Sequence, residues 1–192
     1  MFDDVDRTIA ALLKAELPAD VASQVSISFA TPDDSFPPHG LSLPAINLFL
    51  FEIHENPQLR EIEPRIDRRK DGISVRSPPP VHVDCHYLVT AMAQQQLNSE
   101  QDEHRILGAT MQALLRHRVL PAAVLQGVLA GKTPPVRSAT ALQAAHPSGI
   151  ELWQAIKGKP RACLHYTLTI PVDIAVEETF APPTLKLQVG GV

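Results

Sequence analysis

The chain has 192 residues, enough for one domain with a sizeable hydrophobic core and hardly enough for two. Its apolar fraction of 44% and charged fraction of 20% are close to the globular average, which excludes a disordered or fibrous chain. The net charge of -4, with both signs mixed along the sequence, excludes a broad basic surface for nucleic acid or anionic lipid.

The N-terminus and the cysteines indicate the compartment. The sequence begins MFDDVDRTIA, with acidic residues where a secretory signal has basic ones, and no apolar run approaches the roughly 20 residues of a membrane span. Cys85 and Cys163 each lie in an apolar strand pattern, which favours reduced core residues over a disulfide. We therefore expect a cytoplasmic protein that does not insert into a membrane.

The first half of the chain predicts one helix and two strands. Apolar residues recur at helical spacing over residues 4–17, and residues 25–29 alternate between apolar and polar as in a half-buried strand. A proline-rich loop over residues 31–44 follows. Residues 46–53 are apolar on both faces, so they predict a strand covered on both sides. We expect this strand to lie at the centre of the sheet.

The middle of the chain predicts a hairpin, a second long strand and the longest helix. Asp71 and Gly72 lie between short alternating segments, a strong hairpin signal, and the tip of this hairpin is basic. Residues 81–92 alternate over the length of a long strand. Residues 100–118 form a helix pattern whose apolar stripe consists of Ile106, Leu107, Met111, Leu114 and Leu115.

The last third predicts short helices and a third long strand. A short helix from Pro121 is expected to end at Gly131, with four apolar residues facing the core: Val124, Leu125, Val128 and Leu129. Residues 136–144 predict a strand, a further short helix carries Trp153, which we expect in the core, and residues 162–174 predict the third long strand.

Together these elements predict one α/β (α+β) domain. We expect a mixed, mostly antiparallel, twisted sheet packed by two main and two short helices. The domain is expected to span residues 1–180, followed by an extended C-terminal tail over residues 181–192.

The stretch QGVLAGKTPP has the composition of a phosphate-binding loop but not its spacing. Gly127 and Gly131 are separated by three residues, where that loop has four, and the stretch follows a helix pattern rather than a strand. Pro134 and Pro135 prevent a helix from starting where the phosphate site needs a helix N-terminus. A helix end followed by an extended exit explains the stretch better than nucleotide binding.

The segment HVDCH is the strongest candidate for a metal site. His82, Asp84 and His86 alternate, so a strand places all three side chains on one face, and two histidines with a carboxylate form a known ligand set. Residues two apart on a strand are about 6.5 to 7 Å apart, too far for three of them to reach one ion without a bulge. A polar strand face is the favoured interpretation, and a metal-dependent enzyme or small-ligand binder is the alternative.

The sequence contains no convincing catalytic constellation. Neither cysteine lies in a reactive context, and no serine lies in a Gly-x-Ser-x-Gly elbow. The acidic pair Asp33 and Asp34 and the pair Glu177 and Glu178 lie in loop or tail segments, where solvated charges are usual. We expect no enzyme activity and no cofactor.

Four segments in order resemble a known family: LPAINLFLFEIHENPQLRE, RSPPPVHVDCHYLVTA, EHRILGATMQALLRHRVLP and LWQAIKGKPRACLHYTLTIPV. They are similar to the N-terminal domain of the cap, or tube terminator, proteins of phage-tail-like extracellular contractile injection systems, which resemble phage tail terminators. The resemblance implies a homo-hexameric ring that closes the distal end of the inner tube and sheath, ends tube growth and anchors the last sheath layer. It implies no catalytic residue, and it places the protein in a particle that is assembled in the cytoplasm.

Two segments are predicted to contact partners in such an assembly. The basic hairpin, with Arg65, Arg68, Arg69 and Lys70, is expected to bind an acidic surface of the tube or sheath, and a solvated turn is the alternative. In the tail, three apolar residues alternate with polar ones in a strand pattern: Leu185, Leu187 and Val189. We expect the tail to dock on a neighbouring subunit or on the sheath, and folding back on its own domain is the alternative.

Overall fold

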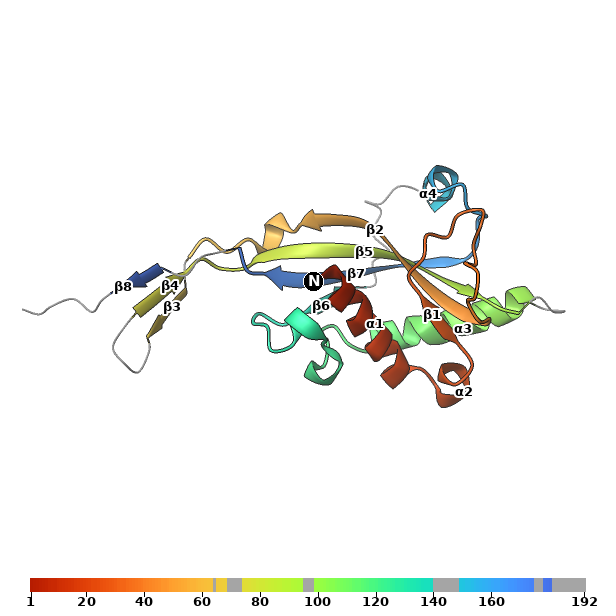
Figure 1. The fold of residues 1–192 in the computed structure, drawn as a ribbon, viewed down its shortest axis with the longest axis horizontal. Coiled ribbons are helices and arrows are strands. Elements are labelled where there is room, and N and C mark those ends of the chain that lie inside the picture. The colour runs from red at the N-terminus through yellow and green to blue at the C-terminus, as the bar shows by residue number, and fades with distance from the viewer. Residues whose placement is uncertain (64, 69–73, 95–98, 140–148, 175–177, 181–192) are drawn as a thin grey trace, which may run out of the picture.

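The computed structural model describes residues 1–63, 65–68, 74–94, 99–139, 149–174 and 178–180. These residues form a five-stranded sheet and a separate three-stranded sheet (Figure 1). The larger sheet has the order β1 (Ser26–Ser28), β2 (Ala45–Glu55), β5 (Val81–Met92), β7 (Cys163–Val172) and β6 (Arg137–Ala139). The β1–β2 pair is parallel and the other pairs are antiparallel, which confirms the predicted mixed, mostly antiparallel sheet.

Two long helices cover one face of the large sheet, and a short one lies on the other side. α1 (Phe2–Glu16) and α3 (Ser99–Leu115) lie below the sheet in Figure 1, together with the four-residue α2 (Ala19–Ala22). α4 (Gly149–Ala155) lies above it, and Trp153 of this helix is buried, as expected. The fold class predicted from the sequence is confirmed.

β5, rather than β2, is the central strand of the large sheet. β5 pairs with β2 on one side and with β7 on the other along most of its length. β1 pairs only with Ala45, Ile46 and Asn47, so the second half of β2 has no neighbouring strand on its outer side among the described residues. The prediction of β2 as the centre was wrong because the second half of this strand, where Ile53 is 43% exposed, lies at the rim of the sheet.

The main core lies between α1, α3 and the face of β5 that carries Cys85, Tyr87 and Val89. These three side chains are fully buried, as is the stripe of α1. The Tyr87 hydroxyl donates a hydrogen bond of 2.7 Å to the carboxylate of Asp6, and this bond ties α1 to the centre of the sheet. The buried apolar residues of α1 are Val5, Ile9, Leu12 and Leu13, in agreement with the helical spacing of the sequence.

The buried face of α3 differs from the predicted stripe. Ile106, Leu107 and Leu114 are buried as predicted, whereas the side chains of Met111 and Leu115 are 38% and 53% exposed. Thr110 and Ala113 take the remaining buried positions. The Thr110 hydroxyl donates to the Ile106 carbonyl at 2.8 Å, so this polar side chain is satisfied within the helix and its burial costs little.

The predicted short helix after Pro121 is replaced by two 3-10 turns, η2 (Ala122–Val124) and η3 (Gly127–Leu129). Val124 and Leu129 are buried as expected and Leu125 is half-buried, but Val128 is 51% exposed. Side chains of α1 hold this segment: Asp4 accepts a hydrogen bond of 3.3 Å from the Val128 backbone, and Thr8 accepts one of 3.0 Å from Gln126. These bonds compete with the backbone bonds of a continuous helix.

Glycines permit this path. Gly127 has a φ of 54°, and a Cβ there would lie 1.9 Å from the Asp4 carboxylate. Gly131 has a φ of 75°, the left-handed conformation predicted for the end of this segment.

The remaining predicted elements are confirmed in part. The strand predicted over residues 136–144 is described as β6 (Arg137–Ala139), and the rest of that range lies outside the described residues. The hairpin is present as β3 (Arg65–Arg68) antiparallel to β4 (Ser74–Ser77), while its predicted turn at Asp71 and Gly72 lies outside them. The domain boundary at residue 180 stays a prediction, because residues 181–192 are also not described.

The same substitution should have a large effect on the buried face of α3 and a small effect on its exposed face. Leu114→Asp should lower the free energy of unfolding by more than about 4 kcal/mol, because Leu114 is 1% exposed and an unpaired carboxylate would enter the core. Leu115→Asp, at the neighbouring exposed position, should cost less than about 1 kcal/mol. Urea unfolding of both variants, followed by circular dichroism, measures the difference. Equal losses at the two positions would contradict the observed helix face.

Candidate functional site

The three-stranded sheet forms an arm at one end of the molecule. β4 lies between β3 and β8 (Glu178–Phe180), and Figure 1 places these strands at the left end, well away from the helices. Of the four basic residues predicted to contact a partner, Arg65 and Arg68 lie in β3, opposite Ser77 and Ser74 of β4. Arg69 and Lys70 lie outside the described residues. The prediction that all four bind an acidic surface therefore remains a prediction.

Exposed apolar side chains occur in the arm and in the segments that lead to it. Ile62 and Ile66 are 89% and 65% exposed, and Ile174, between β7 and the arm, is 64% exposed. Single exposed apolar residues are common, but three isoleucines of this kind near one small sheet mark it as a candidate contact surface. The tail residues predicted as a further contact, Leu185, Leu187 and Val189, lie outside the described residues.

The second face of β5 carries the polar residues noted in the sequence, and a loop covers part of it. The ring of His82 donates from Nδ1 to the Leu59 carbonyl at 3.0 Å. The Asp84 carboxylate accepts hydrogen bonds from Asn56 at 2.9 Å and from Thr169 of β7 at 2.6 Å. The loop that supplies Asn56 and Leu59 includes the 3-10 turn η1 (Pro57–Leu59). Asn56 also caps this turn by accepting a bond of 3.1 Å from Gln58, so it builds the loop.

His82, Asp84 and His86, predicted as an alternative metal site, do not converge on one point. His82 is used by the loop, and Asp84 is held by Asn56 and Thr169. Among the described residues, a set of ligand-type side chains does converge, but only His86 of the predicted three belongs to it. The spacing along one strand separates alternate side chains by about 6.5 to 7 Å, whereas a neighbouring strand is about 5 Å away. Convergence therefore requires a side chain from the neighbouring strand.

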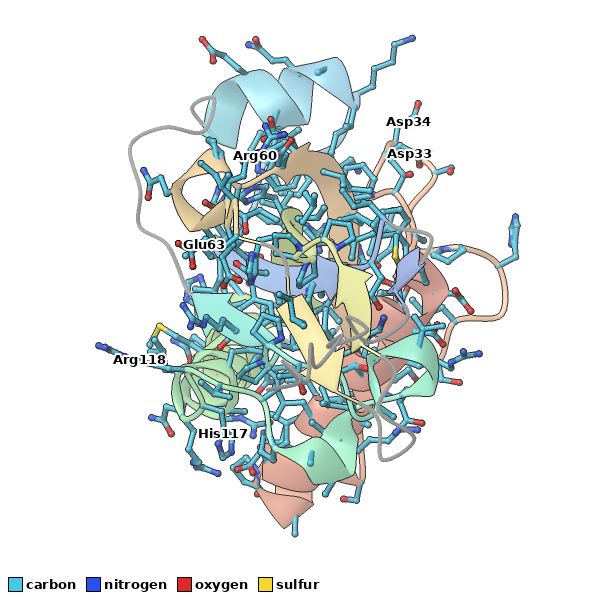
Figure 2. All side chains as sticks on the ribbon, turned by 90° about the vertical axis from the view of Figure 1, so that its left-hand side faces the viewer. Asp33, Asp34, Arg60, Glu63, His117 and Arg118 are labelled. Atoms are coloured by element: carbon cyan, nitrogen blue, oxygen red, sulfur yellow. The ribbon has the colours of Figure 1, made fainter. Side chains whose placement is uncertain are left out.

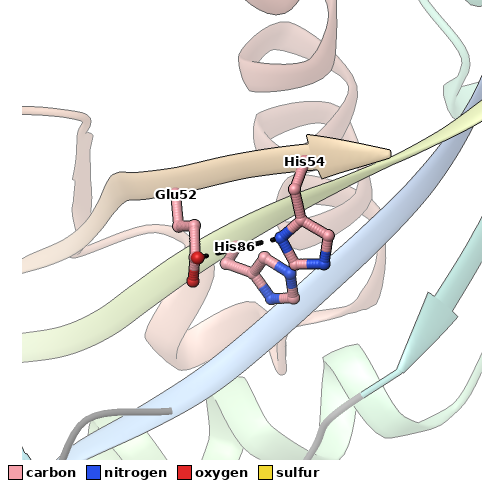
Figure 3. A group of neighbouring side chains, drawn as sticks. All are labelled: Glu52, His54 and His86. Carbon is pink, nitrogen blue, oxygen red and sulfur yellow. Dashed lines mark ion pairs between the residues drawn. The ribbon is translucent and has the colours of Figure 1, made fainter. Parts of the chain in front are cut away.

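The converging residues are Glu52 and His54 of β2 together with His86 of β5 (Figure 3). One ligand atom from each of the three lies within 4.8 Å of the other two. The His54 and His86 rings are stacked, with centroids 4.7 Å apart, and Glu52 Oε1 lies 3.8 Å from His54 Nδ1. Glu52 and His54 were not among the residues predicted from the sequence. The neighbouring letters FEIHE contain them, but no pattern within β2 indicates that they face His86.

The described part of the chain offers no activated nucleophile at the cysteines. Both are free thiols, as predicted, and burial raises the pKa of the Cys85 thiol to about 12. A thiol with this pKa stays protonated at neutral pH and is a poor nucleophile. The acidic pair Asp33 and Asp34 projects from its loop toward solvent (Figure 2), and Asp33 accepts hydrogen bonds from Ser35, as expected for a turn.

Comparison with protein families identifies the chain. Residues 4–186 match the Pvc16 N-terminal domain family, which is nearly the whole sequence. The chain belongs to this family. This match confirms the resemblance carried by the four sequence segments. No helix among the described residues has the length and apolar character needed to cross a membrane.

Solved structures share the fold of this Pvc16 N-terminal domain. It is similar to the PVC sheath/tube terminator of an extracellular contractile injection system in its extended state, with a TM-score of 0.69 and 23% identity, covering 100% of this chain and 63% of that one. It is also similar to the tube-terminating cap of the anti-feeding prophage, with a TM-score of 0.66 and 24% identity over 94% of this chain and 58% of that one. A comparison with curated proteins gives no match. The chain thus spans about three fifths of the length of the solved structures.

The hydrogen bonds around Asp84 predict the effect of removing their donor. Asn56→Ala should lower the free energy of unfolding by about 1 to 3 kcal/mol, because it removes a donor to a nearly buried carboxylate and a cap of η1. Gln58→Ala, which truncates an exposed side chain two residues away, should cost less than about 0.5 kcal/mol. Thermal or urea unfolding compares the two variants. A loss at Gln58 as large as that at Asn56 would mean that the loop, rather than the Asp84 bonds, carries the effect.

Proposed function

We propose that this chain is the ring-forming domain of a cap that ends the tube and sheath of an extracellular contractile injection system. The observation that carries the proposal is the family match over residues 4–186. The likeness in fold to a sheath/tube terminator and to a tube-terminating cap supports it. In this proposal six copies form a ring at the distal end, stop tube growth and anchor the last sheath layer. Assembly takes place in the cytoplasm, and the ring leaves the cell with the particle.

The proposed role requires binding surfaces rather than a reaction. A ring with closed symmetry needs two different patches on each subunit, which meet around the circle. Met111 and Leu115 share an exposed side of α3, and Val119 shortly after the helix is 49% exposed. These apolar residues are candidates for one of the two patches. The arm, with its exposed isoleucines and its basic residues, is the candidate contact with the inner tube or the sheath. No cofactor and no enzymatic turnover are part of the proposal.

The proposal is tested in cells that assemble the particle. Without this chain, electron micrographs should show tubes of widely variable length and sheaths that detach or contract prematurely, because nothing ends the tube or holds the last sheath layer. Expression of the chain from a plasmid should restore uniform lengths. Particles that keep a uniform length without the chain, together with a monomeric mass for the purified protein and its absence from purified particles, would contradict the proposal.

Reversing charge in the hairpin predicts a salt-sensitive loss of docking. The double variant Arg68→Glu with Arg69→Glu should bind tube or sheath at least about tenfold more weakly, with the largest effect at low salt. In the proposal the two arginines face an acidic surface, and glutamates in their place would be repelled by it. The thermal unfolding midpoint should stay unchanged. Lys14→Glu with Lys159→Glu is the matched control, since it makes the same change in net charge at exposed positions of the main body. Docking that is insensitive to the reversal and to salt would favour a solvated turn.

Truncating the tail distinguishes its two predicted placements. A chain ending at residue 180 should keep the thermal stability of the full chain but assemble rings or sheath ends poorly, because a tail strand would add to a sheet edge of another subunit. Size-exclusion chromatography with light scattering and a melting curve measure both properties. A lower melting temperature of the isolated monomer would show instead that the tail folds back on its own domain.

A further inference from the structure

We propose that Glu52, His54 and His86 bind one zinc-class divalent metal ion that joins β2 to β5. The three side chains come from two neighbouring strands, and one ligand atom of each lies within 4.8 Å of the others (Figure 3). The set is a carboxylate oxygen with two imidazole nitrogens, which is a ligand set of zinc and of related first-row transition metals. This inference is independent of the proposed role in a ring, because it concerns the isolated chain.

A β-bulge creates the arrangement. In the first half of β2, Leu48 and Leu50 are paired with Val89 and Tyr87, so the even-numbered residues of β2 share the core face of β5. The register shifts between Leu50 and Glu52. An extra residue in one strand reverses which side chains face each side of the sheet from that point on.

Beyond the bulge, the pairing places Glu52 beside His86 and His54 beside Asp84. These even-numbered residues of β2 now share the polar face of β5, and Ile53 pairs with Cys85 of the core face instead. Without the bulge, Glu52 and His54 would lie on the apolar side. The metal-ligand set therefore depends on one irregularity in the sheet.

To close around an ion, the donor atoms must approach one another and the His54 ring must turn out of its stack on His86, because an imidazole nitrogen binds a metal in the plane of its ring. Zinc bonds of about 2.1 Å in tetrahedral geometry place ligand atoms about 3.4 Å apart, compared with the 4.8 Å within which the three donors lie. His86 is buried and is the fixed ligand. Glu52 and His54 have side-chain exposures of 45% and 46%, so binding an ion moves these two side chains rather than His86.

A polar group lies beside the second nitrogen of each ring, at hydrogen-bond distance for His86 and farther away for His54. The ring of His86 contacts Thr167 of β7 through Nδ1, at 2.8 Å from the hydroxyl oxygen, and donation from Nδ1 leaves Nε2 as the metal ligand. His54 Nε2 lies 3.9 Å from the Asp84 carboxylate, on the opposite side of the ring from Nδ1, which faces Glu52. Asp84 is itself fixed by Asn56 and Thr169. A ligating histidine whose other nitrogen meets a carboxylate or a hydroxyl is the usual outer shell of a protein metal site.

The position of the site indicates what the ion does. It lies in the half of β2 that no strand of the described chain covers on its outer side, where the last four residues of the strand are exposed. An ion that joins β2 to β5 there stabilises the rim of the sheet, since a ligand that binds only the folded state raises its stability. The three protein ligands leave a fourth position for water, because two of the ligands are open to solvent.

The test uses the purified full chain after treatment with EDTA and dialysis. Titration with ZnCl₂ in an isothermal calorimeter should give one ion per chain, and the melting temperature should rise with zinc concentration. Co²⁺ in place of zinc should give visible absorption bands of a four-coordinate nitrogen and oxygen site. Absence of stoichiometric zinc binding, with an unchanged melting temperature, would overturn the proposal and leave the cluster as a polar contact between strands.

Variants locate the bound ion. His54→Ala and Glu52→Gln should each weaken zinc binding at least tenfold, and both side chains are exposed enough for the variants to fold, which circular dichroism verifies. Thr167→Val, which removes the contact to His86, should weaken binding about tenfold. His39→Ala removes an exposed histidine that is not part of the cluster and is the matched control. Zinc binding that survives in both His54→Ala and Glu52→Gln, or that falls equally in His39→Ala, would show adventitious binding and overturn the proposal.

Discussion

The structure depends on the burial of both faces of β5. A strand in this position must satisfy its backbone groups on both edges and its side chains on both faces. β2 and β7 supply the backbone partners along most of its length. α1 and α3 cover Cys85, Tyr87 and Val89, while the loop after β2 bonds to His82 and Asp84 on the other face. The helices, the loop and the neighbouring strands therefore all pack against, or pair with, β5.

The polar face of β5 is compatible with a buried strand because His82, Asp84 and His86 each make a specific polar contact there. Asp84 accepts bonds from a loop and from β7, and His86 contacts Thr167. Buried polar groups with such partners cost little, and they fix one register, because a shift by one residue would turn them toward the apolar core. The bulge in β2 uses the same rule locally: it moves Glu52 and His54 beside His86 and sends Ile53 to the opposite face. One irregularity thus changes both the chemistry and the apolar surface of the rim.

The molecule divides into a packed body and an arm with few core contacts. The body contains the large sheet with its helices, and most of its buried apolar residues form one continuous cluster. The arm is a small sheet of short strands that carries exposed isoleucines, and Figure 1 places it at the end of the body. A sheet of this size gains little from its own core, so contact with another chain would add to its stability. In the proposed ring, the body is the part that keeps the subunit's shape, and the arm is the part that contacts partners.

Local periodicity determined much of this fold from the sequence alone. The stripe of α1, the alternation in β5 and β7, the hairpin strands and the core position of Trp153 follow from residues that lie within one element. The four segments also indicated the family.

Sequence could not decide what depends on neighbours from distant parts of the chain. β2 looked central because periodicity does not reveal that β1 covers only its first residues, and Met111 and Leu115 looked buried because a helix stripe does not show how wide the covering surface is. The cluster of Glu52, His54 and His86 arises from a bulge and a pairing between strands about 30 residues apart, which the letters of either strand do not specify. Side-chain direction is encoded locally, but the surface that a side chain meets is fixed only when the whole chain has packed.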